Sequence, residues 1–278
     1  MAIAQQTLKE EVVIEGQALH SGKMVSMRLI PQSADTGIFF RRNDLPGEPL
    51  VRAEPRNVVS TFRCLSIGTK EWRIQTIEHL MAALHGLEVD NLLIEVSGEE
   101  LPLGDGSAWF FTKALLKTGL ASQDKPRLVR RITSPVWVEN GNDPCSYLLA
   151  LPGEGLRISY CFTSNHRMMG DQFTQFSITP KVFQTELAKA RTIAFTHELE
   201  ALRSQGLALG GNMNVAVVVG ENGYLNTLNY PDEIARHKIL DILGDLYLLG
   251  PVEGQIIGIR SGHKMDHELT MKLEESWK

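Results

Sequence analysis

Apolar residues recur at helical spacing in two segments of the chain. In residues 77–87 they fall on one face of a predicted helix, and Thr76 precedes this segment as the expected N-cap. In residues 232–250 they occur almost all round, which predicts a largely buried helix over 232–248. The apolar positions of these two segments are Ile77, Leu80, Met81, Leu84 and Leu87, then Ile234, Ile239, Leu240, Ile242, Leu243, Leu246 and Leu249.

Short apolar or β-like runs predict strands in both halves of the chain. They lie at residues 11–30, 92–96, 128–139, 146–151, 156–162, 216–220 and 256–259. Further helices are expected at 107–117, at 183–190 and in the polar segment that closes the chain, with mixed structure over 191–212. Because strands and helices do not alternate strictly as βαβ units, the pattern favours an α+β fold over a doubly wound sheet.

The polar stretch at residues 121–127 separates two such patterns. It follows Gly119, contains a proline and is succeeded by a new series of predicted strands. We therefore expect two α+β domains, residues 1–122 and 127–278, joined by a linker at about 121–127. A chain of 278 residues is long enough for either one large domain or two small ones.

Composition narrows the class of protein. Hydrophobic residues make up 43% of the chain and charged residues 22%, an ordinary globular balance. The net charge of −5 gives no global basic field, so we expect no nucleic-acid partner. Cys64, Cys145 and Cys161 are widely spaced and odd in number, which indicates reduced thiols. With no long apolar run and no secretory signal, we expect a cytoplasmic protein.

Three ionisable residues lie along one face of the predicted buried helix. His237, Asp241 and Asp245 are spaced i, i+4 and i+8. A buried carboxylate without a partner costs several kcal/mol, so something must offset that cost. One interpretation is that the three side chains lie on a solvent-exposed face of the helix or form an ion pair with Arg236 or Lys238. The other is a metal ion, because a His and an Asp one turn apart can ligate one ion; a catalytic zinc site would need a third protein ligand.

Two further histidines are candidates for such a site. His79, at the start of the first predicted helix, would be the third ligand, and its neighbour Glu78 would be an adjacent base. His263 follows a predicted strand in the sequence RSGH, where a catalytic group is common and Asp245 could orient it. Each residue taken alone also fits an ordinary structural role. Together, an adjacent Glu base, a His₂Asp metal site and a further His that Asp245 could orient indicate a hydrolase of amides or esters.

Several short motifs occur in order along nearly the whole chain. They are LHSG (19–22), TGIFFRR (36–42), TIEHLMAALHGLEVDN (76–91), ELPLGDGSA (100–108), ART (190–192), RSQGLALGG (203–211), RHKILDILGDLYLLG (236–250) and SGH (261–263). In this combination the chain resembles the UDP-3-O-acyl-N-acetylglucosamine deacetylases, the zinc amidases of the committed step of lipid A biosynthesis.

The resemblance implies a fold, a reaction and a cofactor. The fold would be two α+β domains, each a β-sheet layered against a pair of helices, with the active site between them. The reaction would remove the acetyl group of UDP-3-O-(3-hydroxyacyl)-N-acetylglucosamine to give UDP-3-O-(3-hydroxyacyl)-glucosamine and acetate. Zn²⁺ would be the cofactor, although the same ligand set also suits Fe²⁺ in the cell. The UDP-sugar lipid precursor would be the partner of a monomeric enzyme, with at most transient membrane association.

The resemblance also implies roles for the candidate catalytic residues. His79, His237 and Asp241 would bind zinc, and Glu78 would be the general base. Further roles fall to three residues: His263 would be the cation that stabilises the transition state and protonates the departing amine, Asp245 would orient His263, and Thr192 would help to polarise the acetamide carbonyl.

Substrate contacts are implied in the same way. Lys238 would contact the sugar nucleotide, and Arg260 would lie near its diphosphate, which a guanidinium group suits well. Segment 191–212 would form the apolar passage for the acyl chain. Substrate-binding residues expected in this segment are Ile193, Phe195 and Gly210.

The chain departs from the family pattern in three places, all outside the acid–base and metal set. Ala18 stands where the family usually has glycine, Ile193 stands where it commonly has Phe, and the stretch after Leu225 is short. The departures leave open a metal-dependent deacylase of another sugar nucleotide. A non-catalytic UDP-sugar-binding homologue is the third alternative, although it would not need the acid–base residues Glu78 and His263.

Overall fold

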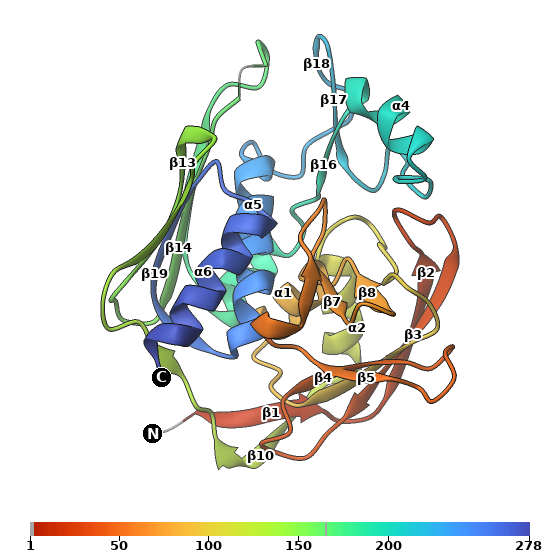
Figure 1. Ribbon diagram of the computed structural model, residues 1–278, viewed down its shortest axis with the longest axis vertical. Helices are drawn as coiled ribbons and strands as arrows, with labels where there is room; N and C mark the ends of the chain where they lie inside the picture. Colours follow the sequence, from red (N-terminus) through yellow and green to blue (C-terminus); the bar gives the residue numbers. More distant parts are fainter. Residues whose placement is uncertain (1–2, 165) are drawn as a thin grey trace.

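The computed structural model describes residues 3–164 and 166–278 as an α+β molecule with two large sheets (Figure 1). The first sheet has the strand order β2-β3-β9-β4-β5. Its strands are β2 (Val12–Gln17), β3 (Met24–Pro31), β4 (Ile38–Arg42), β5 (Leu50–Arg52) and β9 (Leu92–Val96). β4 and β9 run parallel, and the other neighbours are antiparallel.

Two helices accompany this sheet. They are α1 (Glu78–Gly86) and α2 (Trp109–Thr118), which contact each other. A three-stranded sheet of β6 (Val58–Ser60), β7 (Ser66–Gly68) and β8 (Arg73–Gln75) leads into α1, preceded by the short helix η1 (Pro55–Asn57). Every residue of α1 is buried, because the helix lies in the interior of the molecule (Figure 1).

The second large sheet is built from the later part of the chain. Its order is β12-β13-β19-β14-β15, and β11 pairs with β19. The strands are β11 (Arg130–Arg131), β12 (Val136–Asn140), β13 (Asp143–Leu151), β14 (Leu156–Phe162), β15 (Gln172–Ser177) and β19 (Val252–Ile259). Helices α5 (Glu233–Leu246) and α6 (His263–Ser276) pack on this sheet and on each other. α5 therefore lies between the second sheet and α1 (Figure 1).

The remaining elements lie between β15 and α5 in the sequence. They are α3 (Pro180–Val182), the π-helix η2 (Phe183–Leu187), β16 (Ile193–Phe195), α4 (Thr196–Ser204), β17 (Val217–Gly220) and β18 (Gly223–Tyr224), while η3 (Tyr247–Leu249) follows α5. β16, β17 and β18 form a small sheet that carries α4 beside it (Figure 1). No helix in the described residues is long and apolar enough to cross a membrane.

The structure confirms the α+β class and most of the predicted elements, with three differences. The stretch expected as a linker forms β10 (Leu120–Pro126), which pairs antiparallel with β1 (Ala4–Leu8). The N-cap of α1 is Ile77 rather than Thr76, because Thr76 adopts a φ of +59° and donates its hydroxyl to Glu100. The helix expected at 183–190 begins earlier, at Pro180, where the Thr179 side chain caps it. The three cysteines are free thiols.

A close backbone contact joins α1 to α5. A Cβ atom at Gly244 would overlap the backbone carbonyl oxygen of Glu78, so only glycine lets the two helices approach this closely. Further along the same contact, Nδ1 of His85 lies 2.8 Å from the carbonyl oxygen of Leu243, and the His85 ring stacks on Tyr247. This contact fixes which residues of α1 lie opposite which residues of α5.

We expect Gly244→Ala to destabilise the protein. The added methyl group meets backbone rather than a flexible side chain, and overpacking of this kind costs roughly 1–3 kcal/mol. Chemical denaturation would measure the change in the free energy of unfolding. Gly141→Ala is the matched control, because a Cβ there meets nothing within 4 Å. Equal stability of the two variants would contradict the inferred close approach.

Candidate active site

A cavity of about 340 Å³ takes its lining from both halves of the chain. The first half contributes Glu78 and His79 from the start of α1, and the second contributes His237, Lys238 and Asp241 from α5. The lining beside α4 is largely apolar, although Glu198 and Arg203 of α4 also belong to it; the apolar residues there are Ile193, Ala194, Leu199, Leu202, Met213 and Val215. The cavity thus combines a polar, ionisable end with an apolar extension.

Three candidate ligand atoms meet at the polar end. Nε2 of His79 lies 3.9 Å and Nε2 of His237 lies 3.2 Å from Oδ1 of Asp241. The ligand atoms of the three residues are all within 4.8 Å of one another, and all three side chains are buried. His237 and Asp241 are one turn apart on α5, whereas the contact between α1 and α5 brings His79 opposite them.

The hydrogen bonds around this cluster leave its inward-facing atoms free. Nδ1 of His237 lies 3.0 Å from the carbonyl oxygen of Ala190, so this nitrogen carries the proton and Nε2 keeps its lone pair. Oδ2 of Asp241 accepts from Nζ of Lys238 at 2.7 Å. Oδ1 of Asp241 is buried and has no hydrogen-bond partner in the part of the chain that the structure describes. Two imidazole nitrogens and one orphaned carboxylate oxygen fit a divalent transition metal.

The protonation states of the cluster suit a metal as well. Burial, reinforced by His237, lowers the pKa of His79 to about 3, and burial also lowers the pKa of His237. Burial alone would raise the pKa of Asp241, but His237 and Lys238 outweigh it and hold that pKa below its usual range. Neutral imidazoles and an ionised carboxylate are the forms that bind a metal.

Glu78 lies beside the cluster at the first position of α1. Its Oε2 accepts from the backbone N–H of Leu65 at 3.0 Å, and its Oε1 lies 3.9 Å from Nε2 of His263. Burial raises the pKa of Glu78 to about 7; Asp245 and Asp241 add to this shift, and His263 opposes it. A carboxyl group with this pKa can exchange a proton near neutral pH.

His263, which is half-buried, and the buried Asp245 form a pair close to Glu78. Nδ1 of His263, at the start of α6, lies 2.8 Å from Oδ2 of Asp245 on α5. Burial would lower the pKa of His263, but Asp245 reverses this effect and raises it to about 10. His263 is therefore an imidazolium, with Nδ1 directed to Asp245 and Nε2 toward Glu78.

The other residues expected to contact substrate divide into two groups. Thr192, Ile193 and Lys238 line the cavity. Arg260, Phe195 and Gly210 do not belong to its lining, and their proposed contacts with substrate stay predictions.

Each residue of the second group has another place in the fold. Arg260, at the end of β19, pairs with Asp143 at 3.1 Å. Phe195 packs on an apolar cluster behind β16 and β17. Gly210 lies against the carbonyl oxygen of Ala18, where any Cβ would overlap it, while its neighbour Gly211 reaches the cavity.

Sequence reasoning missed two polar residues at the site. His20 lines the cavity, is buried, and has no hydrogen-bond partner for either ring nitrogen within the described residues. Asp266 lies one turn after His263 on α6, close to His263 and Asp245, and burial strongly raises its pKa. The LHSG motif and the i, i+3 spacing from His263 were the available signals, but neither indicates burial on its own.

This combination of a buried His₂Asp cluster, a carboxyl group of raised pKa and a histidine–carboxylate pair defines a metal-dependent hydrolase on an α+β fold. The chain belongs to the UDP-3-O-acyl N-acetylglycosamine deacetylase family, whose model matches residues 5–275. The enzymes of this family are metal-dependent deacetylases, in agreement with the donor set described above.

Curated relatives cover the chain almost completely. A protein of Nitratidesulfovibrio vulgaris is 40% identical over 275 residues, 98% of this chain and 88% of the relative. One of Oleidesulfovibrio alaskensis is 39% identical over 274 residues, 98% of this chain and 89% of the relative. One of Bdellovibrio bacteriovorus is 37% identical over 275 residues, 98% of this chain and 90% of the relative. Each bears the name UDP-3-O-acyl-N-acetylglucosamine deacetylase.

We expect Asp241→Ala to lose bound metal, because it removes one of the three candidate ligands and the orphaned Oδ1 atom. Elemental analysis of the purified, zinc-equilibrated protein would measure metal per chain. Asp232→Ala is the matched control, since Asp232 directly precedes the same helix and pairs with Arg236 instead. Full metal content in Asp241→Ala would remove this residue from the ligand set.

Proposed function

We propose that this protein removes the acetyl group from UDP-3-O-(3-hydroxyacyl)-N-acetylglucosamine, releasing acetate and the free amine in lipid A biosynthesis. The observation that carries the proposal is one cavity that unites the metal-binding cluster, Glu78 and His263, whose Nδ1 lies against Asp245, with an apolar extension. An amphiphilic substrate needs both ends of such a cavity: polar groups at the reacting amide and apolar lining for an acyl chain. Family membership supports the choice of substrate.

His79, His237 and Asp241 are the proposed ligands of Zn²⁺, and Fe²⁺ suits the same set. When bound, the ion would act as a Lewis acid toward the acetamide carbonyl and would lower the pKa of the attacking water. The ion pair from Lys238 neutralises part of the Asp241 charge and holds Oδ2 away from the two histidines. Oδ1, which has no hydrogen-bond partner in the described residues, would then be the carboxylate atom that holds the ion.

Glu78 is the proposed general base. It takes a proton from the water as the water oxygen bonds to the carbonyl carbon. A carboxyl group with a pKa of about 7 is well matched to this transfer, because it is a stronger base than an ordinary glutamate. The Leu65 N–H holds Oε2, which fixes the direction of the other oxygen.

His263 is the proposed acid and cation. Its charge stabilises the developing oxyanion, and its Nε2 proton passes to the nitrogen as the C–N bond breaks. Asp245 keeps the ring oriented and protonated. Thr192 lines the cavity and would add a donor to the carbonyl oxygen, while Lys238 would contact the sugar nucleotide.

The wider organisation is part of the same proposal. We propose that residues 1–122 and 127–278 act as two domains with the active site between them, that the enzyme is a cytoplasmic monomer, and that it meets membranes only transiently. The cavity is lined by both segments, and the cysteines are free thiols, as expected in a reducing compartment.

The direct test is release of acetate from the acylated UDP-sugar before chelation, after chelation and after zinc is restored. We expect release that chelation abolishes and zinc restores. The same UDP-sugar without its acyl chain should be a much poorer substrate. Equal rates on both would favour a deacylase of another sugar nucleotide, and UDP binding without turnover by metal-loaded protein would favour a non-catalytic homologue.

We expect Glu78→Gln to keep its metal but to lose turnover by about 10²–10⁴-fold, since the general base is gone while the ligand set is intact. The two readouts are acetate release and metal per chain, measured on the same sample. Normal metal content separates this result from misfolding. A variant that keeps full activity would exclude Glu78 as the base.

A further inference from the structure

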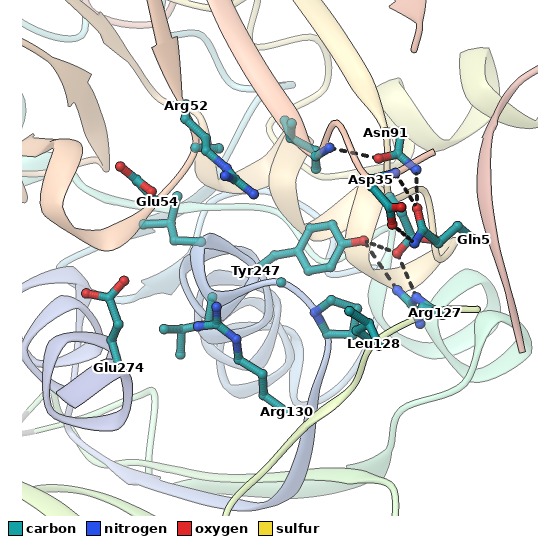
Figure 2. Close-up of a pocket in the computed structure, with 18 of the residues that line it drawn as sticks. Gln5, Asp35, Arg52, Glu54, Asn91, Arg127, Leu128, Arg130, Tyr247 and Glu274 are labelled. Carbon is teal, nitrogen blue, oxygen red and sulfur yellow. Dashed lines mark hydrogen bonds and ion pairs between the residues drawn. The ribbon is translucent and has the colours of Figure 1, made fainter. Parts of the chain in front are cut away.

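A second cavity, of about 570 Å³, lies away from the candidate active site (Figure 2). It shares no lining residue with the first cavity. Its walls come from η1 and β5 of the first half and from β11, η3 and α6 of the second. A volume of this size suits a small-molecule ligand.

Four arginines line this cavity, and two of them already have carboxylate partners. Arg127 pairs with Asp90 at 2.7 Å and with Glu88 at 3.2 Å. Arg56 pairs with both Glu54 and Glu274, at 3.4 and 3.3 Å. Arg52 and Arg130 form no ion pair and no side-chain hydrogen bond within the residues that the structure describes. Figure 2 shows these two guanidinium groups extending into the cavity from opposite walls.

Each free guanidinium group lies near an aromatic ring, and both arginines are exposed. The Arg52 group lies 5.9 Å from the centre of the Phe39 ring, and the Arg130 group lies 5.4 Å from that of Trp277. A guanidinium group that stacks by one face keeps its N–H donors available at the edge. The donors of Arg52 and Arg130 are thus open to solvent and accessible to a ligand.

The carboxylates of the cavity do not neutralise these two cations. Glu54 and Glu274 share Arg56, and Asp90 is bound by Arg127. Asp35 accepts from the Gln5 amide at 2.7 Å, and Figure 2 shows it with Gln5 and Asn91 on the far side of Tyr247 from Arg52. The region between η1 and α6 therefore holds three guanidinium groups and two carboxylates. Like charges that face one space repel, and a bound anion would relieve that repulsion.

We propose that this cavity is a second ligand site, which binds a small phosphorylated molecule between Arg52 and Arg130. Phosphate oxygens match the fork of donors on a guanidinium group. The cavity is larger than a phosphate ion, and Leu128, Leu248 and the Tyr247 ring supply apolar surface for the organic part of the ligand. Such a ligand would contact both halves of the chain at once.

The site is placed to influence the rest of the molecule. Tyr247, Leu248 and Leu249 directly follow α5, the helix that carries His237 and Asp241. At a rise of 1.5 Å per residue, Asp241, which lines the first cavity, and Tyr247, which lines the second, lie roughly 10 Å apart along the same helical segment. A ligand in this cavity would therefore contact residues that directly follow the helix presenting the metal-binding residues.

The test is a titration of the zinc-loaded protein with inorganic phosphate, followed by NMR of the arginine Nε–H groups. The resonances of Arg52 and Arg130, identified by their absence in Arg52→Gln and Arg130→Gln, should shift in a saturable way. When either arginine is replaced, the dissociation constant of phosphate, read from the resonance of the remaining arginine, should rise at least about tenfold. The reason is that each replacement removes charge-assisted hydrogen bonds to the phosphate. Sodium chloride at equal ionic strength should not reproduce the shifts.

Two variants make the result specific to this cavity. Arg131→Gln changes the adjacent arginine of β11, which pairs with Glu253 instead, and should leave the affinity unchanged. Lys238→Gln removes a cation of the other cavity and should also leave these shifts unchanged. The proposal is overturned if millimolar phosphate shifts neither resonance. It is also overturned if replacing one arginine leaves the phosphate affinity read from the resonance of the other unchanged. Acetate release plays no part in this test, so it is independent of the proposed function.

Discussion

The backbone contact between α1 and α5 is the constraint on which the rest of the structure depends. Gly244 lets α5 approach the Glu78 carbonyl so closely that a single methyl group would not fit. At this separation the first turn of α1 faces the middle of α5, so a base and a ligand from one helix meet two ligands from the other. The second large sheet and α6 cover α5, and α2, η3 and α5 itself pack around α1, which explains why both helices are buried.

Burial at this contact also sets the electrostatics of the site. Ionisable groups withdrawn from water have large desolvation costs, and here they offset one another in pairs. Lys238 pairs with Asp241, and His263 pairs with Asp245. Glu78 has no such full partner, and its raised pKa follows from that difference. Burial and these pairs thus keep the candidate ligands in the protonation states that bind a metal. Burial also raises the pKa of the neighbouring Glu78 carboxyl group into the range of a catalytic base.

Local patterning made most of the fold predictable. The apolar periodicity of residues 77–87 and 232–250 located α1 and α5 to within a few residues, because burial imposes that periodicity directly. The pattern failed at β10, where a polar, proline-containing stretch resembles a linker. That strand pairs with β1, more than a hundred residues earlier in the chain, and no local property of residues 120–126 reveals such a partner.

By itself, the sequence determined which residues have side chains that can bind a metal or transfer a proton. It also determined that His237, Asp241 and Asp245 share one helix face, because helical spacing is a local property. Only the tertiary structure decided that His79 faces Asp241, that Lys238 pairs with Asp241 within the same cluster, and that Arg260 turns to Asp143. It alone showed Asp266 and His20 to be buried beside the site, and Arg52 and Arg130 to share a cavity. Burial and unpaired charge arise from distant segments packing together, which no spacing along the chain records.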